Sequence, residues 1–292
     1  MKISGCVEEI INNKNSLSNI LAEEAITQIK KGRVNKPNVV WIEGTGCSGN
    51  TISLLNANYP DVIYLLNNMI NLKFSNSLMT CDGEKAYEIF LETIKEEFIL
   101  VVEGAISTRE NGLFNVIASY KGKKITALEA IKISGYKAKH VIAVGTCASF
   151  GGVSKANPNP SESKSAKEIL GRDVINLPGC PCHPDWIIGT LAYLITNDGI
   201  ELDDEGRPLL FYGFTIHDFC PRRTYFNNRI FAQNVGEPYC MFRLGCRGPV
   251  TRTDCPTRRW NSGVNWPIGD NTPCIGCANA YFPDGMEPFI RF

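Results

Sequence analysis

The chain has 292 residues, of which 43% are hydrophobic and 21% charged, as in an ordinary soluble globular protein. Thirty basic residues balance thirty acidic ones, whereas a protein that binds nucleic acid normally carries a basic excess. The charge balance therefore argues against nucleic-acid binding. Twelve cysteines are too few for a small disulfide-rich protein and too many for incidental core thiols.

The sequence shows no targeting segment and no membrane span. Its first twenty residues lack the basic stretch and apolar run of a secretory signal, and they contain no twin-arginine motif. No apolar run reaches the ~18–20 residues that a transmembrane helix needs. We therefore expect a cytoplasmic protein without a membrane anchor. Disulfides are rare in that compartment, where cysteines more often bind metal or carry out redox chemistry.

The pattern of the sequence changes twice along the chain and predicts three parts. Residues 1–36 predict an N-terminal helical extension, and residues 37–200 alternate between apolar runs and helical patterns. Residues 201–292 lose this periodicity. Four runs are apolar on both faces, as expected of buried parallel strands: 38–42, 98–103, 140–145 and 173–178. Helices are expected between them, at 84–97 and 126–134. This alternation predicts a doubly wound α/β sheet, in which ligands bind at the carboxyl ends of the strands.

Cysteines follow three of the four predicted strands. They are Cys47, Cys147 and Cys180, each in a glycine-containing loop. Because parallel strands end at the same edge of a sheet, we expect these thiols to lie together. Glycines let the backbone approach closely and expose N–H groups to a bound anion, such as a thiolate-ligated iron–sulfur cluster.

The C-terminal part is rich in further metal-ligand types. Six of the twelve cysteines lie between residues 220 and 277, and ten of the thirteen arginines lie beyond residue 200, where there is no lysine. A segment this irregular needs cross-links, which metal centres supply. One group comprises His217, Cys220, Cys240 and Cys246, and it suits either zinc or an iron–sulfur cluster with one imidazole ligand.

A second C-terminal group has three thiols and no evident fourth ligand. Cys255, Cys274 and Cys277 suit a three-iron cluster, because structural zinc requires four ligands and Pro267 cannot ligate. Ten Cys and His candidates thus form three groups. Three clusters in one chain indicate electron transfer over a distance, which a single structural metal would not need.

These residues lie in stretches that resemble the small subunit of nickel–iron hydrogenases. The stretches run in the same order and spacing over about residues 38–289: WIEGTGCSGNTISLLN, AVGTCASFGGV, LPGCPCHPDWIIGTLAYL, HDFCPRRTYF, CMFRLGCRGPVTRTDCPTRRWNSGVNWPIGDNTPCIGC and FPDGMEPF. The resemblance implies a flavodoxin-like domain over 37–200 that binds a proximal cluster. It also implies a domain over 201–292 that binds a medial and a distal cluster.

The resemblance also implies ligands, cofactors and partners. Cys47, Cys147 and Cys180 resemble proximal ligands, and the distal group resembles ligands of a 4Fe–4S cluster. Cys255, Cys274 and Cys277 resemble ligands of a medial 3Fe–4S cluster, with Pro267 where a fourth ligand would stand. The nickel–iron centre belongs to a separate large subunit, so no catalytic residue is expected here. We expect a heterodimer or a dimer of heterodimers that oxidises H2 and passes electrons to a redox protein or a quinone pathway.

One position departs from the family pattern. The usual proximal motif is CTGC, and this chain has CSGN, with Asn50 in place of the second cysteine. The variant resembles cytoplasmic uptake hydrogenases, cyanobacterial ones among them. The fourth iron could be held by Asn50, by water or by another side chain such as the Cys182 thiol, or it could be missing. Loss of a thiolate removes negative charge and should raise the cluster potential, which favours H2 oxidation. Cys6 and Cys81 match no ligand position.

Three alternatives remain at this point. A hydrogen-sensing subunit would use the same clusters for signalling and would turn over slowly. A zinc-stabilised structural protein would use the same cysteines without redox chemistry. A respiratory-complex subunit with a related N-terminal fold would carry only one cluster and would lack the motifs after residue 217.

Overall fold

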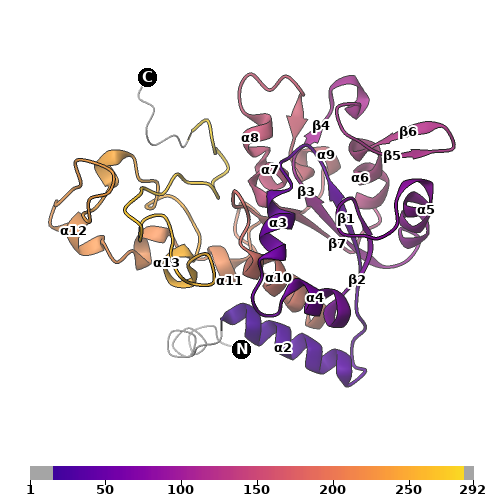
Figure 1. The fold of residues 1–292 in the computed structure, drawn as a ribbon, viewed down its shortest axis with the longest axis horizontal. Coiled ribbons are helices and arrows are strands. Elements are labelled where there is room, and N and C mark those ends of the chain that lie inside the picture. Colours follow the sequence, from indigo (N-terminus) through magenta and orange to yellow (C-terminus); the bar gives the residue numbers. More distant parts are fainter. Residues whose placement is uncertain (1–15, 286–292) are drawn as a thin grey trace.

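The computed structural model describes residues 16–285 and has a five-stranded parallel sheet at its centre (Figure 1). The strands lie in the order β2-β1-β3-β7-β9. When the five strands are renumbered 1 to 5 in chain order, their order in the sheet is 2-1-3-4-5, which is the order of flavodoxin-like folds. Their bounds are β1 (Asn38–Glu43), β2 (Asn71–Ser75), β3 (Phe98–Glu103), β7 (His140–Val144) and β9 (Ile175–Leu177). The predicted α/β fold class is therefore confirmed.

The central strands follow the predicted runs because both of their faces are covered. All six residues of β3 are buried, and β3 pairs in register with β1 from Asn38↔Phe98 to Glu43↔Glu103. The prediction missed β2, in which only Phe74 and Ser75 are buried. This strand lies at the edge of the sheet, where a polar sequence is tolerated and no long apolar run is required.

Helices cover both faces of the sheet and enclose two separate cores. On one face α2, α3 and α10 pack over Val39 and Trp41, and on the other α5 and α6 pack over Val40 and Ile42. The alternation of the two cores along β1 follows the two-residue period of a strand. The longer helices are α2 (Leu17–Lys30), α3 (Gly49–Leu55), α5 (Gly83–Thr93), α6 (Ala127–Gly135), α7 (Gly145–Phe150) and α10 (Pro184–Thr196). Of the predicted extension over 1–36, residues 1–15 lie outside the described residues.

Short elements complete the described part of the chain. In the α/β part they are α4 (Val62–Tyr64), α8 (Gly152–Lys155), α9 (Ala166–Leu170), β4 (Ile106–Ser107), β5 (Val116–Tyr120), β6 (Lys123–Thr126) and β8 (Ser163–Lys164), with a π-helical turn at Leu65–Met69 and a 3₁₀ turn at Arg109–Gly112. Beyond residue 200 they are α11 (Leu209–Tyr212), α12 (Arg223–Asn227) and α13 (Cys255–Arg258), with 3₁₀ turns at Ile216–Phe219 and Phe242–Leu244.

The C-terminal part packs beside the sheet on the side of α3 and α10 (Figure 1). Over residues 201–285 the backbone forms short helices and isolated bridges, with no extended strand ladder. Its buried side chains, such as Trp266 and Ile268, belong to the same core as α10 and β1. The irregular segment therefore obtains its apolar contacts from the sheet domain.

A buried arginine joins the two parts. The Arg258 guanidinium lies 2.6 Å from a carboxylate oxygen of Asp254 and 2.6 Å from one of Asp185, which is in the first turn of α10. Its side chain is 7% exposed and stacks over the ring of Phe211, and Trp186 donates to Asp254 at 2.8 Å. Burial by itself would lower the pKa of Arg258, but Asp254 and then Asp185 raise it. The positive charge of Arg258 can therefore be buried because these two ion pairs stabilise it.

Replacing Arg258 should loosen the junction between the two parts. Arg258→Ala leaves two carboxylates partly buried without their cation, and such a loss costs about 3–5 kcal/mol of unfolding free energy. Denaturant unfolding of the purified protein measures it, with the exposed Arg33→Ala as the matched control. A loss equal to that of the control would contradict the role given to Arg258.

Candidate metal centres

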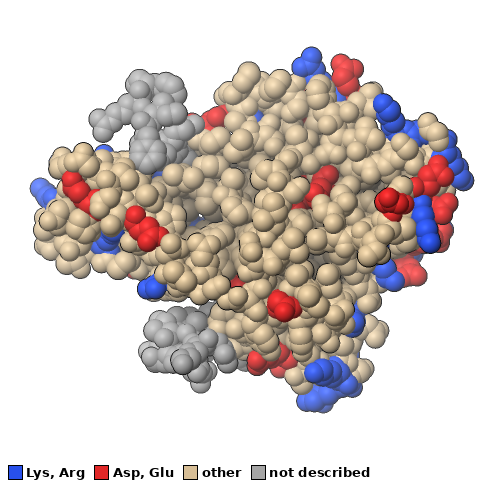
Figure 2. Space-filling view, in the orientation of Figure 1, with Lys and Arg blue, Asp and Glu red and all other residues tan. Residues whose placement is uncertain are grey.

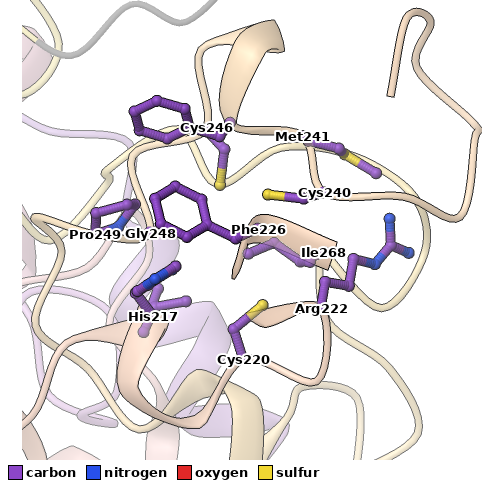
Figure 3. Close-up of a pocket in the computed structure, with 12 residues that line it drawn as sticks. His217, Cys220, Arg222, Phe226, Cys240, Met241, Cys246, Gly248, Pro249 and Ile268 are labelled. Atoms are coloured by element: carbon purple, nitrogen blue, oxygen red, sulfur yellow. The ribbon is translucent and has the colours of Figure 1, made fainter. Parts of the chain in front are cut away.

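The four residues of the predicted distal group line a single small cavity. Figure 3 shows the sulfurs of Cys220, Cys240 and Cys246 and the ring of His217 directed toward a common space. His217 lies in the 3₁₀ turn Ile216–Phe219 with Cys220 directly after it, and the two other cysteines flank the turn at Phe242–Leu244. Two turns that are distant in sequence thus bring together four ligand atoms.

The surroundings of this cavity favour metal ligation. Burial, and then the nearby Arg223, lowers the pKa of His217, so its ring is neutral near pH 7 and keeps a free nitrogen lone pair. Burial raises the pKa of the Cys220 thiol, and the nearby backbone N–H of Arg222 opposes this rise. The Arg222 guanidinium is buried and donates to the carbonyl oxygens of Glu237 and Tyr239. Sequence reasoning did not single out this fixed positive charge.

The three residues of the predicted medial group line a second cavity together with Pro267. Burial, and then Cys277, raises the pKa of Cys255 to about 12. The Thr253 hydroxyl lies 3.1 Å from the Cys255 sulfur, and the Gly276 N–H donates to the Cys274 sulfur at 3.4 Å. Buried thiols with donors directed at their sulfurs suit bound thiolates, because the donors stabilise the negative charge that burial opposes.

The three residues of the predicted proximal group meet at the carboxyl edge of the sheet. Cys47 follows β1, Cys147 lies in α7 directly after β7, and Cys180 follows β9. Burial raises the pKa of Cys180 to about 11, with further contributions from Cys147, Cys277 and Cys47. The crevice between β1 and β3 is the point where the strand order reverses, which is where ligands bind in such sheets.

Two glycines allow the close approach that this site requires. Gly152 has a φ of +48°, and a Cβ there would lie 2.9 Å from the Cys147 sulfur. Gly145 has a φ of +84°, and a Cβ there would lie 2.5 Å from the side-chain nitrogen of Asn50. A larger residue at either position would strain the backbone and displace a functional side chain.

Asn50 is held by hydrogen bonds on both sides of its amide. Its nitrogen donates to Glu103 at 3.2 Å, and its oxygen accepts from the Cys182 N–H at 2.8 Å. The side chain thereby links the loop of Cys47 to the segment that carries Cys180. Both amide atoms are thus already engaged in bonds to protein groups.

Glu103 ends β3 with a carboxylate that is 2% exposed. It accepts five hydrogen bonds, from Trp41 Nε1, the Asn50 N–H and side-chain amide, and the Thr51 N–H and hydroxyl. Sequence reasoning missed this residue. The signal was present in FILVVE, where an acidic residue ends an otherwise apolar buried strand.

The remaining described thiols are not placed as ligands of these groups. Cys182 is fully buried in the core beside α10, and burial raises its pKa well above the usual range. Its sulfur lies 3.6 Å from the His183 carbonyl oxygen. Cys81 is half-buried against the other core, and Cys6 lies outside the described residues.

The spacing of the side chains differs from that of a site for a single metal ion. Within residues 16–285 no three His, Cys, Asp or Glu side chains converge closely enough to hold one ion. Structural zinc requires four ligand atoms about 2.0–2.3 Å from a single point. Ligands arranged around a cavity instead suit a cluster, whose irons each take one protein ligand.

Comparisons with known families cover both parts of the chain. Residues 212–290 match the family model for the C-terminal part of the "NiFe/NiFeSe hydrogenase small subunit". Residues 47–194 match "NADH ubiquinone oxidoreductase, 20 Kd subunit". The periplasmic [NiFeSe] hydrogenase small subunit of Desulfomicrobium baculatum is 40% identical over 275 residues, which is 87% of each chain. This chain belongs to the family of nickel–iron hydrogenase small subunits.

Solved structures agree with this assignment. An H2-activated [NiFeSe] hydrogenase from Desulfomicrobium baculatum matches with a TM-score of 0.83 at 39% identity, covering 87% of this chain and 98% of that one. An actinobacterial-type NiFe hydrogenase from Ralstonia eutropha matches with a TM-score of 0.81 at 30% identity, covering 89% of this chain and 85% of that one. The prediction of an electron-relay small subunit, in an oxidoreductase of H2 with its active site on the large subunit, is confirmed, and the two alternative functions are not favoured.

The predicted cytoplasmic location is contradicted. The relatives from Desulfomicrobium baculatum and Solidesulfovibrio fructosivorans are both named as periplasmic, the second being 37% identical over 264 residues that cover 88% of this chain and 82% of that one. The prediction rested on the N-terminal residues of the sequence, and a targeting signal is an address read by a receptor that leaves no trace in the fold. Among the described residues, no helix is long and apolar enough to cross a membrane.

Replacing Glu103 should disturb the small subunit at the proximal group. Glu103→Gln replaces one acceptor oxygen with an NH2 group that faces N–H and O–H donors. Buried donors then lack a partner, which should lower the free energy of unfolding by about 1–3 kcal/mol. Denaturant unfolding and iron content of the purified hydrogenase measure the effect. The matched control is Glu96→Gln at the far, amino end of the sheet. Unchanged stability and iron content would show that the carboxylate is dispensable.

Proposed function

We propose that the three groups hold three iron–sulfur clusters in series. Cys47, Cys147 and Cys180 bind the proximal cluster, and Cys255, Cys274 and Cys277 bind a medial 3Fe–4S cluster. His217, Cys220, Cys240 and Cys246 bind a distal 4Fe–4S cluster. The observation that carries the proposal is that the distal group converges on one cavity and the medial group on another, with Cys180 of the proximal group beside the medial one. Cys180 lines the medial cavity, and Cys246 contributes to the raised pKa of Cys274.

In this assignment each part of the chain has its own role. We assign the proximal cluster to a domain over 37–200, the other two to a domain over 201–292, and a supporting role to the extension over 1–36. The clusters supply one-electron transfer, because each can exist in two oxidation states. The chain's own residues hold the thiolates and direct N–H and O–H donors at sulfurs of the medial group.

The proximal cluster is proposed to have only three protein ligands. Asn50 is not assigned as the fourth ligand because its amide oxygen and nitrogen already bond to the Cys182 N–H and to Glu103. Cys182 is not assigned because its thiol is enclosed in the core beside α10. A cluster with three thiolates carries less negative charge than one with four, and its potential is correspondingly higher. This supports oxidation of H2 as the working direction.

The partner is the hydrogenase large subunit, and we place its contact surface over α3. Ile52 and Leu55 on this helix are 56% and 49% exposed, and Ile63 in α4 is 66% exposed. Figure 2 shows few charged side chains over α3, whereas Lys, Arg, Asp and Glu gather along the edge formed by α5 and β5–β6. Exposed apolar side chains without surrounding charges are typical of a permanent subunit interface.

Electrons leave the chain at the distal group. Phe219 and Phe242, which flank this group, are 44% and 46% exposed. The Phe226 ring packs against the His217 ring with centroids 4.7 Å apart, which holds the imidazole in place. The acceptor is a redox protein or the entry to a quinone pathway.

The composition of the purified complex tests the proposal as a whole. We expect roughly ten or eleven irons per small subunit with matching acid-labile sulfide, together with nickel from the large subunit. Anaerobic purification of the complex, metal and sulfide analysis, and H2-dependent dye reduction measure this. Zinc without sulfide would contradict the clusters, and slow turnover with a bound signalling protein would favour a sensor.

Removing one distal ligand should affect only the distal cluster. In Cys240→Ala the distal cluster loses one thiolate ligand. We therefore expect its EPR signal to be lost or altered, and the small subunit to contain about one to four fewer irons. The proximal and medial signals should remain, and the control Cys81→Ala should retain all three. Loss of a different signal would refute the assignment of these ligands.

Replacing Asn50 tests the three-ligand proximal cluster. Asn50→Ala removes the bond to Glu103 and the acceptor for the Cys182 N–H, so the protein should lose stability while the iron content stays unchanged. Iron analysis and EPR of the anaerobic complex, alongside denaturant unfolding, separate the two effects. Loss of about one iron from the proximal cluster would identify Asn50 as a ligand.

A further inference from the structure

Cys277 is the member of the medial group that lies beside the proximal group. It lines the same cavity as Cys180, and it contributes to the raised pKa of Cys180 on one side and to those of Cys255 and Cys274 on the other. Burial raises the pKa of the Cys277 thiol, and the backbone N–H of Cys180 opposes this rise. A backbone donor of the proximal group thus lies near a sulfur of the medial group.

The hydroxyl of Thr146 holds this junction together. Thr146 is 1% exposed and directly precedes Cys147 at the start of α7. Its hydroxyl accepts from the Gly179 N–H at 2.9 Å and donates to the Cys277 carbonyl oxygen. Its own N–H donates to the Gly179 carbonyl at 3.0 Å. One side chain therefore contacts the segments that carry Cys147, Cys180 and Cys277.

This arrangement creates a short connection between two ligand sulfurs. From the Cys180 sulfur the path runs through Cβ, Cα and the amide nitrogen, and then from its N–H to the nearby Cys277 sulfur. An N–H directed at a ligand thiolate also stabilises the reduced cluster, which raises its potential. The placement of this N–H therefore bears both on the electronic contact between the two clusters and on the potential of the medial one.

We propose that Thr146 is a positioning residue for electron transfer from the proximal to the medial cluster. Its hydroxyl fixes the Cys277 backbone against the Gly179–Cys180 segment, so that the Cys180 N–H stays directed at the Cys277 sulfur. In the step it supports, the proximal cluster loses one electron and the medial cluster gains it, with no proton transferred and no bond broken. The inference rests on the proposed assignment of the clusters.

The test compares Thr146→Val with Thr146→Ser in the complete two-subunit enzyme, purified without oxygen. Valine keeps the shape and removes the hydroxyl, whereas serine retains the hydroxyl. An EPR-monitored redox titration should give a lower medial potential in Thr146→Val, an unchanged distal potential, and a medial potential close to wild type in Thr146→Ser. Reduction of the medial cluster after rapid mixing with H2 should be several-fold slower in the valine variant.

Two controls separate this inference from a general loss of structure. Ser149→Ala removes another buried hydroxyl of α7, one that donates to the Ala143 carbonyl at 3.1 Å and does not contact Cys277. It should leave the medial potential unchanged. If Thr146→Val gives too little enzyme, Thr146→Ala removes the same hydroxyl without a branched side chain and takes its place.

The outcomes distinguish the inference from the proposed function. A wild-type enzyme without three cluster signals would refute the cluster assignment itself. With three wild-type signals present, an unchanged medial potential in the hydroxyl-free variant would refute only the role of Thr146. Equal shifts in the valine and serine variants would also refute it, because the hydroxyl would then not be the cause.

Discussion

The carboxylate of Glu103, enclosed at the end of the central strand, organises the carboxyl edge of the sheet. Five donors from β1 and from the start of α3 converge on it, and no cation is paired with it among the described residues. Burying an unpaired charge is costly, so the donors must stay in place. The start of α3, directly after the loop of Cys47, is therefore tied to the sheet, and Asn50 extends this link to the segment that carries Cys180.

The C-terminal part depends on this rigid edge because its own backbone forms little regular structure. Its apolar side chains share the core of α10, and Arg258 joins it to that helix through Asp185. Its cysteines are costly to ionise in place, since burial raises the pKa values of Cys255 and Cys274. Binding to iron would reverse this cost, because a coordinated thiolate has its charge neutralised. Fold and cofactor would in this way stabilise each other.

The two family matches suggest how the relay is assembled. The α/β part matches a family named for a subunit of NADH ubiquinone oxidoreductase, and the C-terminal part matches one named for hydrogenase small subunits. The junction between them contains Thr146, Cys180 and Cys277. The hydrogen bonds at this point give a physical means of joining the two parts.

The sequence by itself determined the parallel sheet and the family, and it predicted the three ligand groups. Buried strands appear in the sequence as apolar runs, and the ends of parallel strands share one edge of the sheet. Cys and His residues at short spacings indicate metal binding without knowledge of the fold. Only the tertiary structure decided the bonds of Asn50, the burial of Cys182, the role of Glu103 and the contact of Cys277 with Cys180. Those features join residues that are tens to more than a hundred positions apart, such as Asn50 and Cys182. No local pattern can encode such contacts, because they exist only once the chain has packed.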